Sequence, residues 1–164
     1  MNKKTISWII VIIWAIVIFV MSSMNTNESN NSSKHVINNV VEKTVETTNG
    51  LGITDKHPSK NKMDQVIEKL NYPLRKAAHA SEYFIFTILI LIALKNSGVK
   101  GNKRFIIALV ICFIYACTDE YHQTFVNGRT GQFSYTLIDN FGGFVSCLMY
   151  TFMMKINKIR KKHI

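Results

Sequence analysis

Four long apolar runs alternate with polar segments along the chain. The runs cover Ile6 to Met21, about Ala77 to Leu94, about Phe105 to Tyr121 and about Ser134 to Met154. A helix needs about 20 mainly apolar residues to cross the hydrocarbon core of a bilayer. Within lipid, a helix also satisfies its own backbone hydrogen bonds. The pattern therefore predicts an all-α polytopic membrane protein, built as a bundle of four transmembrane helices.

The segment between the first and second runs is more polar. It opens with SSMNTNESNNSSK, a composition typical of a flexible linker. The stretches VINNVVEKTVE and MDQVIEKL follow, with apolar residues at helical spacing, and Gly50, Gly52 and Pro58 separate them. We expect two short extracytoplasmic amphipathic helices that lie on the membrane surface or cap the bundle. The alternative is that they bind a partner.

Composition agrees with a membrane protein and argues against a nucleic-acid binder. The chain is 48% hydrophobic and carries a net charge of +10. A soluble nucleic-acid binder would place its Lys and Arg on one face of a folded domain, whereas here they cluster between apolar runs. The three cysteines lie within the runs without Cys-x-x-Cys spacing, so we read them as packing residues and expect no disulfide.

Basic residues predict the orientation in the membrane. The N-terminus, the loop KNSGVKGNKR and the tail KINKIRKKHI contain Lys and Arg but no acidic residue. With four spans, these three segments lie on one side, which the positive-inside rule makes cytoplasmic. Both termini are then cytoplasmic, and the polar segment after the first run lies outside the cell.

The chain divides on this basis into four parts. Residues 1–24 form an N-terminal transmembrane helix, for which a cleaved signal peptide is the alternative. Residues 25–72 form the extracytoplasmic segment, residues 73–154 a three-helix membrane region and residues 155–164 a basic cytoplasmic tail.

Titratable side chains gather at the predicted outer ends of the last three spans. Glu82 and Asp139 lie near the start of the second and fourth runs, and Asp119 near the end of the third. Such groups normally turn inward and pair, because charge within a span is costly. The spacing places Arg75, His79 and Glu82 on one helix face, and Asp119, His122 and Gln123 on another, whereas we expect Glu120 to face away from Asp119. We predict a polar layer at the outer membrane surface with these binding residues: Arg75, His79, Glu82, Asp119, Glu120, Gln123, Arg129 and Asp139.

These residues also carry a family resemblance. The segments RKAAHASEY, DEYHQTFVNGR and DNFGG occur in this order within about residues 75 to 154. The chain thereby resembles the VanZ-like family of bacterial membrane proteins. The resemblance implies a multi-pass protein of the bacterial cell envelope and, through the family's namesake, an accessory role in tolerance of the glycopeptide antibiotic teicoplanin.

Three functions remain open on this evidence. The first is a non-catalytic protein whose polar layer binds membrane lipid, a lipid-linked wall precursor or an envelope protein. The second is an enzyme acting on a lipid headgroup or lipid-linked precursor, with His79 or His122 as general base, Glu82 or Asp119 orienting it, and Arg129 holding a phosphate. The third, a transporter, would need titratable groups through the inner halves of the spans, which contain none. We favour binding, with no nucleic acid as partner.

A metal site is a variant of the enzyme hypothesis. His-x-x-Glu and Asp-x-x-His place His79 with Glu82, and Asp119 with His122, as pairs of metal ligands on one helix face. Salt-bridged pairs have the same spacing, so the sequence predicts no metal and no other cofactor.

Overall fold

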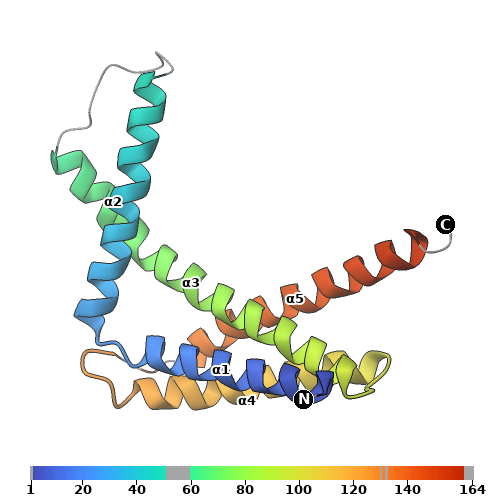
Figure 1. Cartoon of the computed structure of the whole chain (residues 1–164). Coiled ribbons are helices and arrows are strands. Elements are labelled where there is room, and N and C mark those ends of the chain that lie inside the picture. Colours follow the sequence, from blue (N-terminus) through green and yellow to red (C-terminus); the bar gives the residue numbers. More distant parts are fainter. Residues whose placement is uncertain (1, 51–59, 130, 132, 161–164) are drawn as a thin grey trace. The chain divides into compact units, whose positions relative to one another are not determined.

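The computed structural model in Figure 1 describes residues 2–50, 60–129, 131 and 133–160, and within these ranges it contains helices and no strand. The prediction of an all-α protein is confirmed. The helices are α1 (Lys3–Ser22), α2 (Thr26–Gly50), α3 (Lys60–Asn96), α4 (Asn102–Gln123) and α5 (Phe133–Arg160).

Four of these helices are long and apolar enough to cross a membrane. The spans are Lys3–Ser22, Asp64–Asn96, Asn102–Gln123 and Phe133–Ile156. They contain the four predicted runs, so the expectation of four transmembrane helices is confirmed. Large apolar side chains remain exposed along them, such as Ile12, Val110 and Phe152. This is the surface that a helix bundle presents to lipid, because lipid tails are as apolar as the side chains that face them.

The segment after the first span differs from the prediction. SSMNTNESNNSSK is not a linker, because most of it belongs to the helix α2. Asn25 Oδ1 accepts a hydrogen bond from the Glu28 amide at 2.9 Å, and Glu28 Oε2 accepts one from the Asn25 amide at 3.1 Å. This reciprocal cap satisfies amides that would otherwise lack partners at a helix start. The spacing Asn-x-x-Glu indicates such a cap, but the polar composition of the segment led to the prediction of a linker.

The second amphipathic stretch is also part of a longer helix. MDQVIEKL forms the start of α3, which continues through Pro73 to Asn96. The segment between the first and second spans thus contributes one long helix and the beginning of a second, rather than two short helices. Gly52 and Pro58, which were expected to separate the two stretches, lie outside the described residues, as do residues 161–164 of the basic tail.

The chain forms two compact units. Residues 1–23 and 79–164 make up the bundle unit, and residues 24–78 make up the hairpin unit of α2 with the beginning of α3. In the bundle unit the Ser7 hydroxyl accepts from Asn96 Nδ2 at 3.3 Å, and Trp8 Nε1 donates to Ser97 Oγ at 3.0 Å. These bonds join the start of α1 to the end of α3, so the two helices are antiparallel.

Tryptophan and tyrosine side chains join α1 to its neighbours in the middle of the bundle. Trp14 Nε1 donates to the Glu82 carbonyl at 3.0 Å, and the Tyr115 hydroxyl donates to the Ala15 carbonyl at 2.6 Å. The Tyr115 ring also lies 4.9 Å from that of Phe86, between ring centres. Such polar bonds inside a membrane bundle fix the contact faces of helices that hydrophobicity alone does not orient.

Glycines bring α5 close to α3. A Cβ atom on Gly142 would collide with the Ala80 carbonyl oxygen, and one on Gly143 would lie 2.9 Å from both Cys112 Sγ and Thr87 Oγ1. Small residues allow this approach of helix backbones in lipid. The contact sets the position of Asp139, one turn before Gly142 on α5.

Arg104 lies at the end of the bundle where the α3–α4 loop is, and it contacts both this loop and α5. It is 8% exposed, and its Nε and one terminal nitrogen donate to the Val99 carbonyl at 3.0 and 2.7 Å. Its other terminal nitrogen lies 3.5 Å from the Tyr150 hydroxyl on α5. From the sequence, Arg104 was used only as one of the basic residues that predict the orientation in the membrane. In the structure it also links the α3–α4 loop to α5.

Candidate functional site

Asp119 is the centre of a hydrogen-bonded chain at the end of the bundle opposite Arg104. It is 3% exposed. Its Oδ1 accepts from the Ser22 hydroxyl at 2.5 Å, and its Oδ2 accepts from Gln123 Nε2 at 3.1 Å. Gln123 Oε1 in turn accepts from Arg129 at 3.0 Å. The predicted spacing on α4 thus does bring Asp119 and Gln123 together, and it connects them to Arg129.

Arg129 is positioned by the turn that follows α4. The Phe125 and Val126 amides continue the helical bonding, and the Arg129 amide donates to the Val126 carbonyl at 3.1 Å. Gly128 has φ +76°, in the left-handed region that an L side chain rarely adopts. This geometry explains the Asn-Gly pair before Arg129 and turns the guanidinium back towards Gln123.

His79 and Glu82 form the second part of the cluster. His79 Nδ1 lies 3.7 Å from Glu82 Oε2, and both side chains are 18% exposed. The predicted shared face on α3 is therefore present. Glu82 also lies near enough to Asp119 and Arg129 to interact with their charges. The two parts of the cluster therefore belong to one electrostatic environment.

Tyr83 lies between the carboxylates. Its side chain is fully buried, with Asp119 and Asp139 close to its hydroxyl. That hydroxyl interacts with the Asp119 carboxylate, although it does not meet the geometry of a close hydrogen bond. Tyr83 is therefore a third polar neighbour of Asp119, beside Ser22 and Gln123.

Asp139 and Glu120 are both buried, with exposed fractions of 3% and 6%. Glu120 was expected to face away from Asp119, and its burial shows that the other face it lies on is also covered by protein. The chain after α4 folds back over this position, because the Glu120 carbonyl oxygen lies 2.8 Å from where a Cβ of Gly131 would be. A helical wheel of α4 alone cannot show a face that is covered by the chain that follows the helix.

His122 and Arg75 have other surroundings. His122 stacks on Phe19, with ring centres 4.4 Å apart, and its Nε2 lies 3.1 Å from the Ser23 hydroxyl. Arg75 belongs to the hairpin unit, where it donates to Asn30 Oδ1 at 2.8 Å. Its membership of the polar layer stays a prediction.

The metal variant finds no support in the part of the chain that is described. There, no three His, Cys, Asp or Glu side chains are grouped so that they could hold a metal ion. The four proposed ligands are instead engaged separately: His79 faces Glu82, Asp119 binds Ser22 and Gln123, and His122 stacks on Phe19.

The contribution of α1 to the cluster was not predicted from the sequence. Ser22 binds Asp119, Ser23 and Phe19 contact His122, and Trp14 binds the backbone of Glu82. The only indication in the sequence was the serine pair after the first apolar run. Two serines at that position are equally typical of the end of a transmembrane span. The first helix is therefore part of the site as well as an anchor.

Fold and site together define a polytopic helical membrane protein with a buried polar cluster at one end of its bundle. A family model described as VanZ/LLP1 matches residues 7–154. The chain belongs to the VanZ/LLP1 family, and the match includes most of α1, which the three sequence motifs do not reach. No curated protein and no solved structure matches the chain significantly.

Proposed function

We propose that this protein acts in the bacterial cell envelope by binding a lipid, a wall precursor or a partner protein through its buried polar cluster. The observation that carries the proposal is the burial of three acids, Asp119, Glu120 and Asp139, at one end of a membrane bundle. Charge in a span is costly and normally marks function. The guanidinium of Arg129 is a donor suited to phosphate or carboxylate groups.

The proposed orientation places this cluster on the outer surface of the cell membrane. The opposite end of the bundle carries the acid-free basic segments, which the positive-inside rule assigns to the cytoplasm. Lipid headgroups and lipid-linked wall precursors are then within reach of Arg129. A ligand with both an acidic group and a hydrocarbon part fits this position.

The finer role that we propose is an accessory function in teicoplanin tolerance, as the family's namesake suggests. Teicoplanin carries an acyl chain that holds it at the membrane surface, and vancomycin lacks that chain. A protein that changes this surface, or competes for what the drug meets there, affects the two drugs differently. Expression in a sensitive Gram-positive host should therefore raise tolerance to teicoplanin more than to vancomycin.

Variants connect that effect to the site. Minimum inhibitory concentrations of both drugs are measured with Glu82→Gln, Asp119→Asn and Arg129→Gln, and membrane levels of each protein are checked. The three changes should remove the teicoplanin effect, whereas Glu42→Gln on the exposed surface of α2 should retain it. Equal shifts for the two drugs, or full activity of all three folded site variants, would contradict the role.

An enzyme acting on a lipid headgroup or lipid-linked precursor is the second candidate. The His79–Glu82 pair favours it, because a carboxylate beside an imidazole orients it as a general base. Purified protein incubated with labelled phospholipid and polyisoprenyl-linked precursor would then release product. His79→Gln should abolish turnover while leaving ligand binding in place, and binding without turnover by the unmodified protein favours the first candidate.

A further inference from the structure

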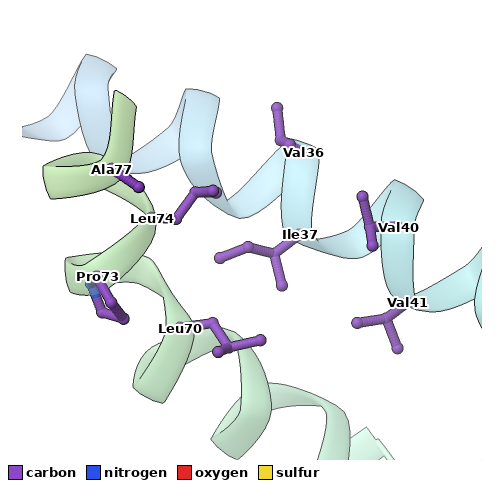
Figure 2. A pocket seen from close by; sticks show the side chains of 8 residues that line it. All are labelled: Val36, Ile37, Val40, Val41, Leu70, Pro73, Leu74 and Ala77. Carbon is purple, nitrogen blue, oxygen red and sulfur yellow. The ribbon is translucent and has the colours of Figure 1, made fainter. Parts of the chain in front are cut away.

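The two units differ in the chemistry that their surfaces offer. In the hairpin unit, the described residues that line the groove between α2 and the beginning of α3 have hydrocarbon side chains alone (Figure 2). These side chains contain no group that would react with a ligand. In the bundle unit, by contrast, a hydroxyl meets an imidazole where α1 ends, because Ser23 Oγ lies 3.1 Å from His122 Nε2.

The Ser23–His122 pair is held in place by both helices. Ser23 directly follows α1, and its hydroxyl donates to the Phe19 carbonyl at 2.6 Å, from which it can turn to His122. The Phe19 ring stacks on the imidazole, with ring centres 4.4 Å apart. Ser23 is exposed, so a molecule at the membrane surface can reach its oxygen. A hydroxyl within hydrogen-bond reach of an imidazole nitrogen is the arrangement that activates serine as a nucleophile.

A carboxylate lies near the imidazole. Asp119 precedes His122 by three residues on α4 and interacts with the charge of its ring. Hydrogen bonds from Ser22 and Gln123 fix the carboxylate. Negative charge beside an imidazole stabilises the imidazolium that forms when the ring takes a proton. Ser23, His122 and Asp119 thus supply a nucleophile, a base and a compensating charge.

The depth of Ser23 in the membrane indicates the substrate. At a rise of about 1.5 Å per residue, the 20 residues of α1 extend for about 30 Å, the thickness of the hydrocarbon core. Ser23 therefore lies at the boundary of that core, where the ester groups of glycerolipids are. Val20 and Met21 are exposed, so acyl chains of lipids can lie beside the last turn of α1 with their esters near the hydroxyl.

We propose that Ser23 and His122 hydrolyse an acyl ester of a membrane glycerolipid. His122 Nε2 takes the hydroxyl proton while Ser23 Oγ attacks the ester carbonyl carbon. The bond from this carbon to the glycerol oxygen then breaks, and His122 gives the proton to that oxygen. Water, deprotonated by the same nitrogen, attacks the acyl-serine and releases the fatty acid, and the proton returns to Ser23 Oγ. Ester and water thus become lysolipid and fatty acid, without an oxidant or other co-reactant.

This activity is independent of the antibiotic role and of the orientation in the membrane, because both leaflets contain glycerolipid esters. It also uses other residues than the His79–Glu82 pair. The nucleophile is tested on the full chain in nanodiscs with a fluorophosphonate, which forms a covalent bond with activated serines. Peptide mass spectrometry should locate the adduct on Ser23. His122→Gln should slow its formation by roughly a hundredfold, the contribution of a general base.

Ser134→Ala is the matched control for Ser23→Ala. Ser134 is an exposed serine at the start of α5, at the same end of the bundle, and it bonds no histidine among the described residues. Turnover is measured in nanodiscs of ether-linked phosphatidylcholine that contain ester-linked phosphatidylglycerol with a labelled acyl chain. The unmodified protein and Ser134→Ala should release labelled fatty acid, and Ser23→Ala should release no more than empty nanodiscs. Asp119→Asn should lower kcat and leave KM unchanged, because the carboxylate acts on the imidazole and not on the lipid.

Three results would overturn the proposal. The first is a probe that labels Ser134 as fast as Ser23, and the second is an unmodified protein that releases no fatty acid above empty nanodiscs. Both are read on the unmodified protein, so they decide the matter even where a variant does not fold. The third is full turnover by Ser23→Ala, which would assign the hydrolysis to other residues.

Discussion

Ser22 gives the sharpest test at the scale of single residues. Its hydroxyl donates to the buried carboxylate of Asp119, and a hydrogen bond to a charged group contributes about 1.5–3 kcal/mol. Ser22→Ala should lower the free energy of unfolding in detergent by about that amount. Ser7→Ala is the comparison, because Ser7 is also buried in α1 but its hydroxyl bonds only neutral groups: it donates to carbonyls of its own helix and accepts from Asn96 Nδ2. That change should cost about 1 kcal/mol or less, and equal losses would show that the Ser22–Asp119 bond has no special weight.

The sequence predicted one kind of site residue and missed another. Glu82, Asp119 and Asp139 were found because a carboxylate near a span is conspicuous and helical spacing pairs it with neighbours on its own helix. Ser22 was missed because a serine at the end of a span is ordinary until a second helix places an acid beside it. The contact lies between residues 97 positions apart, and no spacing rule covers that distance.

At the scale of helices, the approach of α5 to α3 depends on Gly142. Gly142→Ala would drive a methyl group into the Ala80 carbonyl, and backbone at a packed contact cannot move aside without loss elsewhere. We expect a loss of about 1–3 kcal/mol in unfolding free energy, as for other overpacked interiors. The site should also be disturbed, because Asp139 lies one turn away.

The control for this change is Gly50→Ala at the end of α2. A Cβ there meets nothing within 4 Å, and its backbone is helical, so the substitution should be neutral or slightly stabilising. Both variants are compared by denaturant unfolding in the same detergent. If they behave alike, close packing of α5 on α3 does not contribute to stability.

Helix existence was predictable where apolar runs were long and was missed where polar composition dominated. Runs of Ile, Val, Leu and Phe have few alternatives to helix in lipid, so all four spans were expected. The polar start of α2 was taken for linker because Ser and Asn are poor helix formers. The cap between Asn25 and Glu28 and the polar bonds to α3 outweigh that preference.

At the scale of the whole molecule, the bundle separates its charges by end. Lys3 and Lys103 lie at the end where α1 meets the end of α3, and the buried acids lie at the other. We expect the basic end in the cytoplasm. That orientation decides whether the polar cluster can meet wall precursors at all, so it is the assumption on which the proposed function most depends.

Labelling of single cysteines on intact cells tests this orientation. The background is a variant that lacks the three natural cysteines, Cys112, Cys117 and Cys147. Ser32→Cys on α2, Asn102→Cys at the start of α4 and Ser134→Cys at the start of α5 each replace an exposed residue. An impermeant thiol reagent should label positions 32 and 134 and should reach position 102 only after the cells are permeabilised. Labelling of position 102 alone would be consistent with the four-span fold but would show that its orientation in the membrane is the reverse of the one expected. The acids would then face the cytoplasm, and the binding of outer wall precursors would be excluded, because no precursor on the outer surface could reach Arg129.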